Sequence, residues 1–242
     1  ETAFRLFEVS GSIRDELMGI DNPPDRDFCA EAPSWEALLE LCDDNMERVF
    51  LITPEFFTIR GRMPNGDSID VVMCRADGPS SDGRHPDHVT PGSLFDDLAR
   101  RDFTVNAMAR EVDPTTLEAI GDVIDPFRGL EDLQTRTLRC VGDTTARLNE
   151  DFLRILRAAR FCITKNMGPS VDLQEELRND KMWLSMMSTV SIERVREEMQ
   201  KMLKHSGVDA IRFLSTRCAH AALDATLGHS SGIWLKPTLE KR

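Results

Sequence analysis

The stretch Ser10-Gly11-Ser12-Ile13-Arg14-Asp15 separates a strand-forming segment, residues 4–9, from a pattern typical of a helix. We expect residues 4–9 to form a short strand that leads through a turn of small residues into that helix. Small residues at a helix start leave backbone N–H groups accessible to a phosphate. This stretch is therefore a candidate phosphate-binding turn.

Two carboxylates, Asp25 and Asp27, lie on alternate residues of the segment that we predict to be the next strand. In an extended chain, residues i and i+2 face the same side, so these side chains point together and Arg26 points away. Neighbouring anions repel unless a cation lies between them, and Mg²⁺ prefers oxygen ligands. Asp70, between strand-forming residues, is either exposed at an edge or turned towards a ligand. A solvated turn is the alternative interpretation of the Asp25/Asp27 pair, because Asp-x-Asp is common in acidic chains.

The composition is that of a globular protein, with 242 residues, 40% hydrophobic, 30% charged and a net charge of −12. Residues 1–110 carry 11 Lys and Arg against 22 Asp and Glu, whereas residues 111–242 carry 19 against 20. An acidic protein is a poor general binder of nucleic acid, so any RNA contact requires a local basic face. We expect that face in the second half of the chain.

No apolar run approaches the ~20 residues that cross a bilayer, so we expect no membrane partner. The chain begins with Glu1 rather than Met, which indicates a processed or trimmed N-terminus, and it shows no leader pattern. Six scattered cysteines favour reduced thiols in the cytoplasm, or an organelle matrix, over a zinc site. They are Cys29, Cys42, Cys74, Cys140, Cys162 and Cys218.

The spacing of apolar residues and turn formers predicts an α+β protein, with mixed strands and helices up to a boundary near residue 138 and helices after it. The expected helices of the first part cover residues 34–42 and 93–99. The expected strands cover residues 49–52, 56–62, 68–75, 108–112 and 117–120, with a hairpin turn at Pro64-Asn65-Gly66-Asp67 and a loop over 76–92. The later helices are expected at 144–163, 173–179, 191–205 and 208–222.

Arg101 and Asp102 follow the helix predicted over residues 93–99. Cations are favoured at a helix C-terminus by the dipole, and the same residues could contact a ribose or a phosphate. The residues alone leave both interpretations open.

Asp151 and Arg154 are three residues apart in the helix predicted over 144–163, and Arg157 and Arg160 continue the same face. This spacing favours a solvated surface ion pair, which usually contributes less than ~1 kcal/mol. Alternatively, the carboxylate and the guanidinium could bind the edge of a base, with the further arginines forming the local basic strip.

These stretches occur together, in this order, in one family. Residues 5–205 resemble the tRNA nucleotidyltransferase/poly(A) polymerase family, the bacterial and eukaryotic type of CCA-adding enzyme. The most specific stretch is Leu98-Ala99-Arg100-Arg101-Asp102-Phe103-Thr104-Val105-Asn106-Ala107-Met108-Ala109. The resemblance also covers residues 11–19, 25–28, 82–87, 125–133, 138–143, 150–161 and 191–195.

The resemblance implies a polymerase-β-like nucleotidyltransferase head over residues 1–138 and a helical neck over 139–205. Residues 206–242 would be a short remnant of the body, since family members carry substantial helical body and tail domains. The chain is therefore either a fragment or a naturally minimal enzyme. Ser10 stands where relatives usually have the first glycine of a Gly-Gly pair.

The resemblance also implies roles for individual residues. Asp25 and Asp27 would hold two Mg²⁺ ions, one lowering the pKa of an RNA 3′-hydroxyl and the other stabilising the leaving pyrophosphate, with Asp70 as the third catalytic carboxylate. The implied nucleotide-binding residues are Gly11 and Ser12 at the triphosphate, Arg14 anchoring that turn, Arg101 and Asp102 at the ribose, Asn106, the base-selecting pair Asp151 and Arg154, and Arg157 and Arg160.

The implied activity is template-independent addition of C and/or A, as CCA, to the 3′ end of tRNA from CTP and ATP, with release of pyrophosphate. Poly(A) or A-only addition is the alternative within the same class. A catalytically idle RNA-binding relative would not need an electrostatically costly carboxylate pair. A nucleotidyltransferase that modifies proteins or small molecules should lack the pair Asp151 and Arg154.

Overall fold

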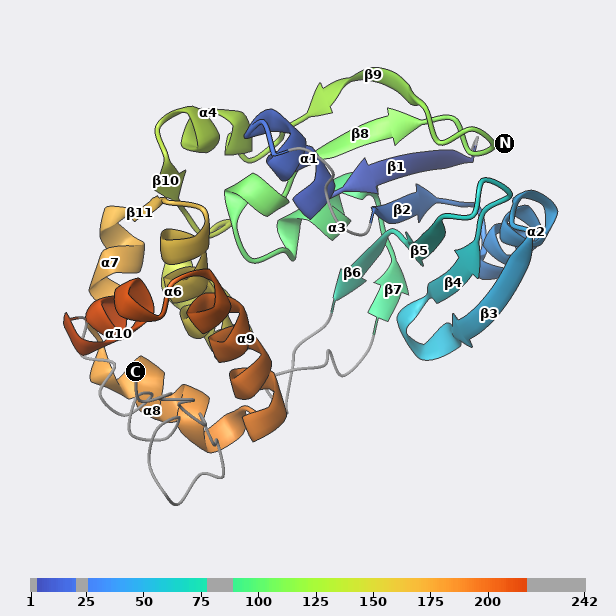
Figure 1. Cartoon of the computed structure of the whole chain (residues 1–242). Coiled ribbons are helices and arrows are strands. Elements are labelled where there is room, and N and C mark those ends of the chain that lie inside the picture. The colour runs from blue at the N-terminus through green and yellow to red at the C-terminus, as the bar shows by residue number, and fades with distance from the viewer. Residues whose placement is uncertain (1–3, 21–25, 78–88, 217–242) are drawn as a thin grey trace, which may run out of the picture. The chain divides into compact units, whose positions relative to one another are not determined.

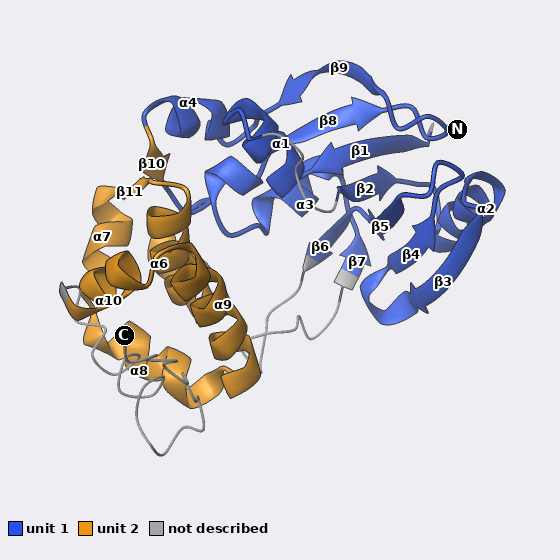
Figure 2. Cartoon of the chain, in the orientation of Figure 1, with its two compact units in different colours: residues 1–79, 86–135, 139–142 blue, residues 80–85, 136–138, 143–242 orange. Residues whose placement is uncertain are grey.

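A computed structural model describes residues 4–20, 26–77 and 89–216 (Figure 1). The chain divides into two compact units (Figure 2). Unit 1 comprises residues 1–79, 86–135 and 139–142, and unit 2 comprises residues 80–85, 136–138 and 143–242. Each unit is described by itself below.

Unit 1 is built on a mixed seven-stranded sheet of order β3-β4-β5-β2-β1-β8-β9. The pair β2–β5 is parallel and the other neighbours are antiparallel. The strands are β1 (Arg5–Val9), β2 (Asp27–Glu31), β3 (Arg48–Thr53), β4 (Thr58–Arg62), β5 (Ser68–Met73), β8 (Ala109–Val112) and β9 (Ala119–Ile124). This mixed sheet with helices, followed by helical unit 2, confirms the predicted α+β class.

The two faces of this sheet carry separate clusters of buried side chains, as the alternation of side chains along a strand requires. One face packs Phe28 and Val71 against Leu38 of α2 (Trp35–Asn45). The other face packs Phe7 and Cys29 against α3 (Leu94–Ala99) and the segment before β8. By the same alternation, the side chains of Asp27 and Asp70 point to this second face.

Local sequence features explain where several elements begin and turn. The Ser34 hydroxyl accepts a hydrogen bond from the Ala37 N–H at 3.1 Å, which confirms the predicted start of α2. The predicted hairpin β4–β5 is also confirmed. In its turn Gly66 has φ +93°, a conformation that glycine adopts at no steric cost, and Asn65 accepts the Asp67 N–H at 3.0 Å.

Unit 1 also contains several short elements. These are α1 (Gly11–Leu17), α4 (Gly129–Gln134), 3-10 turns at Pro54–Phe56 and Thr104–Asn106, and the pair β6 (Arg75–Asp77) and β7 (Val89–Pro91). The pair β6–β7 occupies the two ends of the predicted 76–92 loop, whose residues 78–88 lie outside the described ranges. Strand β9 begins two residues later than predicted, because Leu117 sits in a turn with φ +58°.

Unit 2 is helical apart from one short parallel pair, β10 (Thr137–Leu138) and β11 (Gly168–Pro169). Its helices are α5 (Thr144–Glu150), α6 (Leu153–Thr164), α7 (Val171–Leu177), α8 (Asp180–Thr189), α9 (Ile192–His205) and α10 (Gly207–Thr216). Helix α6 packs against α9, and Ile155, Trp183 and Leu214 are fully buried. Helix α8 was not predicted from the sequence.

The prediction of one helix over residues 144–163 is wrong, because the chain breaks between α5 and α6. Asp151 is extended, with φ −148° and ψ 103°, and its carboxylate accepts the Leu153 N–H at 3.0 Å. An aspartate side chain that bonds a nearby backbone N–H competes with the helix in this way.

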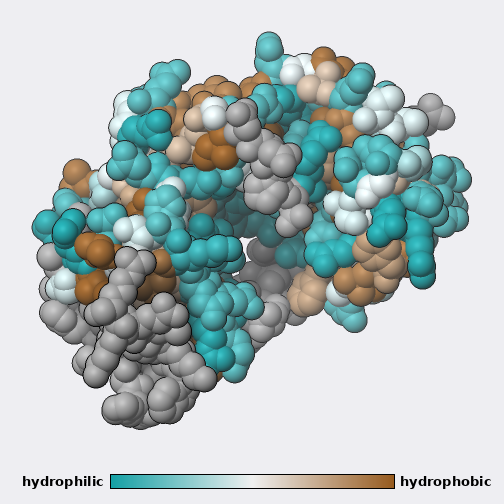
Figure 3. Space-filling model, in the orientation of Figure 1, coloured by the Kyte–Doolittle hydropathy of each residue, from teal (hydrophilic) through white to brown (hydrophobic). Residues whose placement is uncertain are grey.

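Among the described helices, none is long and apolar enough to cross a membrane. The hydropathy view shows hydrophilic residues between separate hydrophobic patches (Figure 3). The described edge strand β3 contributes Phe50, Leu51 and Ile52 to the exposed apolar residues.

Candidate active site

Asp27 and Asp70 are direct neighbours across the parallel pair of strands β2 and β5. Paired residues on adjacent strands point to the same face of a sheet, so the two carboxylates share one face. The same row continues through Val9 on β1 and Arg60 on β4. Asp25, the other half of the predicted pair, lies outside the described residues. The fold thus joins two carboxylates that are far apart in the sequence.

The Asp70 carboxylate also forms a two-point ion pair with Arg60, with both N–O distances at 2.5 Å. The Arg60 side chain is 51% exposed and that of Asp70 is 29% exposed. An exposed ion pair of this kind contributes up to ~1 kcal/mol, so it leaves Asp70 available to a competing cation.

The described residues hold no group of three or more His, Cys, Asp or Glu side chains placed for a metal ion. Asp27 and Asp70 supply two carboxylates on one face, and this is the donor set that a hard divalent cation prefers. Their chemistry therefore fits Mg²⁺, with any third carboxylate to come from outside the described ranges.

The candidate phosphate-binding turn, residues 10–15, lies between β1 and α1. Ser10 has φ +71°, a conformation that favours glycine, and its N–H donates to the carbonyl oxygen of Met108 at 3.3 Å. Its hydroxyl donates to the carbonyl oxygen of Asn106 at 3.4 Å. Serine thus occupies a glycine-like position, held by hydrogen bonds to residues 106 and 108.

A buried network supports this turn. Arg14, 7% exposed, donates through Nε to Asp15 at 2.8 Å and through Nη1 to the Asn106 side-chain oxygen. The Asn106 amide in turn donates to Asp102 at 2.9 Å. Three of the predicted nucleotide-binding residues, Arg14, Asn106 and Asp102, therefore form one hydrogen-bonded chain that ties the turn to residues 102–106.

Arg101 joins the turn to α3. Its Nη1 donates to the Ser10 hydroxyl, its Nη2 donates to Asp97 at 2.7 Å, and its buried Nε has no hydrogen-bond partner among the described residues. Burial lowers the pKa of Arg101, but the charge of Asp97, with a contribution from Asp27, raises it above its ordinary value. Arg101 is thus a fixed cation near Asp27.

Asp97 is a functional candidate that the sequence reasoning missed. It is fully buried and pairs with both Arg101 and Arg100, the latter at 2.5 Å. Burial raises the pKa of Asp97, but the two arginines outweigh burial and hold it below its usual range. The i, i+3 and i, i+4 spacing of an aspartate to two arginines is the pattern that would have identified it.

In unit 2, the prediction that Asp151 and Arg154 share one helix face is wrong, since Asp151 precedes α6. The Asp151 carboxylate accepts from Arg194 of α9 at 2.7 Å. Arg154 donates to Glu150 and to the carbonyl oxygen of Arg147, each at 2.7 Å. The predicted base-selecting residues are therefore each held by a different neighbour.

The predicted basic strip on α6 is partly neutralised from α9. Glu198, 3% exposed, pairs with Arg160, with Arg157 at 3.7 Å and with Lys201 at 3.3 Å. Burial raises the pKa of Glu198, but the charges of Arg160 and Arg157 leave it below its ordinary value. Glu198 was not identified from the sequence, although it follows Arg194 at helical spacing on α9.

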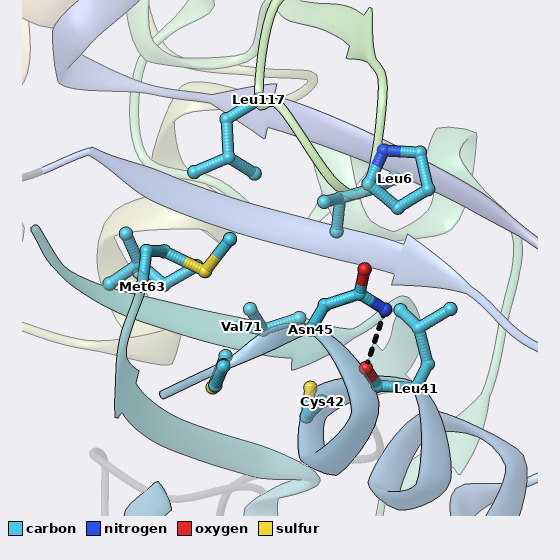
Figure 4. A pocket seen from close by; sticks show the side chains of 10 residues that line it. Leu6, Leu41, Cys42, Asn45, Met63, Val71 and Leu117 are labelled. Carbon is cyan, nitrogen blue, oxygen red and sulfur yellow. Dashed lines mark hydrogen bonds between the residues drawn. The ribbon is translucent and has the colours of Figure 1, made fainter. Parts of the chain in front are cut away.

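One apolar pocket lies beneath α2 (Figure 4). Its lining residues Leu6 and Val71 belong to the sheet face opposite that of Asp27. Its volume of about 10 Å³ is enough for a single water molecule. Its lining includes Leu6, Cys42, Met63 and Leu117. This pocket is too small and too apolar for a nucleotide.

Comparison with known proteins gives a family match over residues 6–139, to the poly(A) polymerase head domain. The CCA-adding enzyme of Lactobacillus helveticus is 36% identical over 205 residues, and that of Lactobacillus johnsonii is 32% identical over 206 residues. Each alignment covers 84% of this chain and 47% of the relative. The chain therefore spans about half the length of the curated relatives that it matches.

Solved structures of CCA-adding enzymes also match this chain. The Bacillus stearothermophilus CCA-adding enzyme in complex with CTP matches with a TM-score of 0.75 and 28% identity, over 93% of this chain and 51% of that one. The Thermotoga maritima CCA-adding enzyme complexed with tRNA matches with a TM-score of 0.70 and 25% identity, over 91% of this chain and 48% of that one. With a family match over more than half of its length, the chain belongs to the tRNA nucleotidyltransferase/poly(A) polymerase family.

Proposed function

We propose that the protein is a template-independent RNA nucleotidyltransferase that adds C and/or A, as CCA, to the 3′ end of tRNA from CTP and ATP. The observation that carries the proposal is the placement of Asp27 beside Asp70, on the sheet face near Arg101. The relatives named above are CCA-adding enzymes, one of them solved with CTP and one with tRNA.

Asp27 and Asp70, with Asp25, would hold divalent metal, and we propose two Mg²⁺ ions. Bound there, the ions would lower the pKa of the RNA 3′-hydroxyl and stabilise the charge of the departing pyrophosphate. Neutral side chains in place of these carboxylates would remove the oxygen anions that such hard cations require.

The chain's own residues would bind and orient the nucleotide. Backbone N–H groups at Gly11 and Ser12 would bind the triphosphate, and the Arg14 network would keep that turn rigid. Arg101, fixed by Asp97, would bind the ribose and discriminate NTP from dNTP.

We assign the selection of the nucleotide base to residues of unit 2. Asp151 offers carboxylate acceptors and Arg154 offers planar donors, which together can satisfy the edge of C or A. The arginines Arg157 and Arg160 would contribute positive charge for the nucleotide. We accordingly assign residues 1–138 as the catalytic head, 139–205 as the neck and 206–242 as part of the body, in a protein of the cytoplasm or an organelle matrix.

The proposed reaction class is tested with each α-labelled NTP in turn, in Mg²⁺ or in EDTA, with a tRNA transcript that lacks CCA or with no RNA. We expect label from CTP and ATP, but not from GTP or UTP, to enter the RNA only when Mg²⁺ is present. Labelling of protein rather than RNA, or no transfer from any NTP, would contradict the proposal.

A further inference from the structure

Arg26 immediately precedes Asp27, and its side chain lies on the opposite face of the sheet. Its Nε and Nη2 donate to the two Glu8 carboxylate oxygens, both at 2.9 Å, and Nη2 also donates to the Leu117 carbonyl oxygen at 2.9 Å. The guanidinium carbon lies 5.1 Å from the centre of the Phe28 ring. The residue next to Asp27 is thus anchored at three points.

Glu8 is central to this arrangement. It lies on β1, opposite Phe28 in register, and is 7% exposed. Burial raises the pKa of Glu8, but the hydrogen bonds and charge of Arg26 outweigh burial and keep it below its ordinary value, so Glu8 is a carboxylate at neutral pH. This buried carboxylate of β1 therefore holds the residue that precedes Asp27.

Apolar side chains could pack on this face in place of the ion pair. The neighbouring side chains Leu6, Phe28 and Val71 are apolar, and a well-packed apolar pair of similar volume is often as stable as a buried ion pair. A two-point arginine–carboxylate contact adds a fixed geometry that apolar contacts lack. Residues that orient metal ligands typically change metal affinity or activity by about 10- to 100-fold when replaced.

We propose that Glu8 and Arg26 are positioning residues, whose ion pair holds Asp27 against Asp70. The inference rests on the proposed function, since it assigns the pair to the metal site described above. Arg26 would act on the metal through Asp27, and Glu8 would act through Arg26.

The chain offers a matched control at the other end of β1. Arg5 also forms a two-point ion pair with a neighbouring strand, to Glu111 on β8 at 2.6 and 3.2 Å, and it contacts Glu31 on β2 at 3.5 Å. Arg5→Met removes an arginine that links the same strands but lies far along β1 from Val9, the partner of Asp27.

The test measures direct binding of Mn²⁺, as a probe for the Mg²⁺ site, by electron paramagnetic resonance in the presence of ATP. We expect Arg26→Met to weaken Mn²⁺ binding about 10-fold or more, and Arg5→Met to leave it within about twofold of wild type. Glu8→Gln, which removes the charge that holds Arg26, should also weaken Mn²⁺ binding. Equal Mn²⁺ affinity in wild type and Arg26→Met would overturn the inference.

A double variant separates positioning from simple stabilisation. Replacing the pair by Glu8→Leu with Arg26→Leu should restore the melting temperature lost in the single variants but not the Mn²⁺ affinity. Recovery of both would overturn the positioning role, and this variant keeps the test valid if Arg26→Met folds poorly.

Different results would contradict the proposed function and the positioning role of Glu8 and Arg26. Wild-type protein that binds Mn²⁺ but transfers no nucleotide to RNA contradicts the proposed function, and the variants still decide the positioning role. Wild-type protein that binds no Mn²⁺ contradicts both.

Discussion

Asp27 on β2 and Asp70 on β5 lie directly opposite each other in the parallel strand pair of an otherwise antiparallel sheet. Asp27 is exposed at the start of its strand, and Asp70 is half-buried beside Arg60. Two carboxylates in this position repel each other, and the ion pair of Asp70 with Arg60 offsets part of that repulsion. A divalent cation bound between the two carboxylates would offset the rest.

Asp27→Asn should abolish transfer while leaving the fold intact. The exposed side chain contributes little to stability, whereas losing one anionic metal ligand should lower kcat at least about 100-fold. Single-turnover incorporation of labelled CTP and ATP measures the effect. Asp122→Asn, which neutralises an exposed carboxylate on β9 of the same sheet, should behave as wild type. Retention of a tenth of the activity in Asp27→Asn would refute the assignment.

Arg101→Lys should reduce the preference for NTP over dNTP by about 10-fold, because a lysine cannot reproduce both guanidinium contacts. Its neighbour Arg100 provides the control, since it binds the same Asp97 without the contact to Ser10. The ratio of kcat/KM for ATP and dATP is the measurement. An unchanged ratio in Arg101→Lys, or an equal change in Arg100→Lys, argues against the ribose contact.

Arg154→Ala should reduce the selectivity for the base more than it slows nucleotide transfer. Loss of the planar donor should lower discrimination of CTP and ATP from UTP and GTP by about 10- to 100-fold, as for one good base contact. Competition between labelled nucleotides reports this ratio, and Arg178→Ala, at the exposed end of α7, serves as the control. Unchanged selectivity would remove Arg154 from the base-reading site.

Glu198 should make the stability of the protein depend on acid pH. Its folded pKa lies below the ordinary value of 4.5, so its ionised form contributes stability that is complete above about pH 4.5 and is lost as pH falls through the folded pKa. Glu198→Gln should therefore cost about 3 kcal/mol at neutral pH. The difference from wild type should shrink below pH 4.5.

Urea unfolding followed by circular dichroism across pH 3–7 provides the measurement. Glu197→Gln, at the exposed neighbouring position on α9, should change neither the stability at neutral pH nor its acid dependence. A Glu198→Gln variant as stable as wild type at pH 7 would show that the three cations do not require this carboxylate.

Much of the fold follows from local chemistry that is visible in the sequence. The Ser34 cap, the Asn65-Gly66 turn and the alternation of buried residues along β5 each specify an element without reference to the rest of the chain. The pairing of Asp27 with Asp70 does not follow in this way. Period-2 alternation assigns each carboxylate to a face of its own strand, whereas their adjacency depends on the parallel pairing of β2 with β5.

The break at Asp151 shows a second limit of predicting the fold from the sequence. Apolar spacing continues across residues 144–163, so the periodicity predicts one helix. The Leu153 N–H instead donates a hydrogen bond to the Asp151 carboxylate, and the helix is interrupted there. The partner of Asp151 is then Arg194, on a helix that only tertiary packing brings near. Helix α8 was missed for a different reason, because its polar and apolar residues are only weakly segregated and its sequence lacks a clear amphipathic pattern.

Ordered nucleotide addition tests the central claim most directly. The protein is incubated with Mg²⁺, CTP and ATP and three tRNA transcripts that end before CCA, after one C and after CC. We predict addition of C, C and A to the first, C and A to the second, and A alone to the third. Failure of all three transcripts to accept any nucleotide, with CTP and ATP still bound by the protein, would contradict the account.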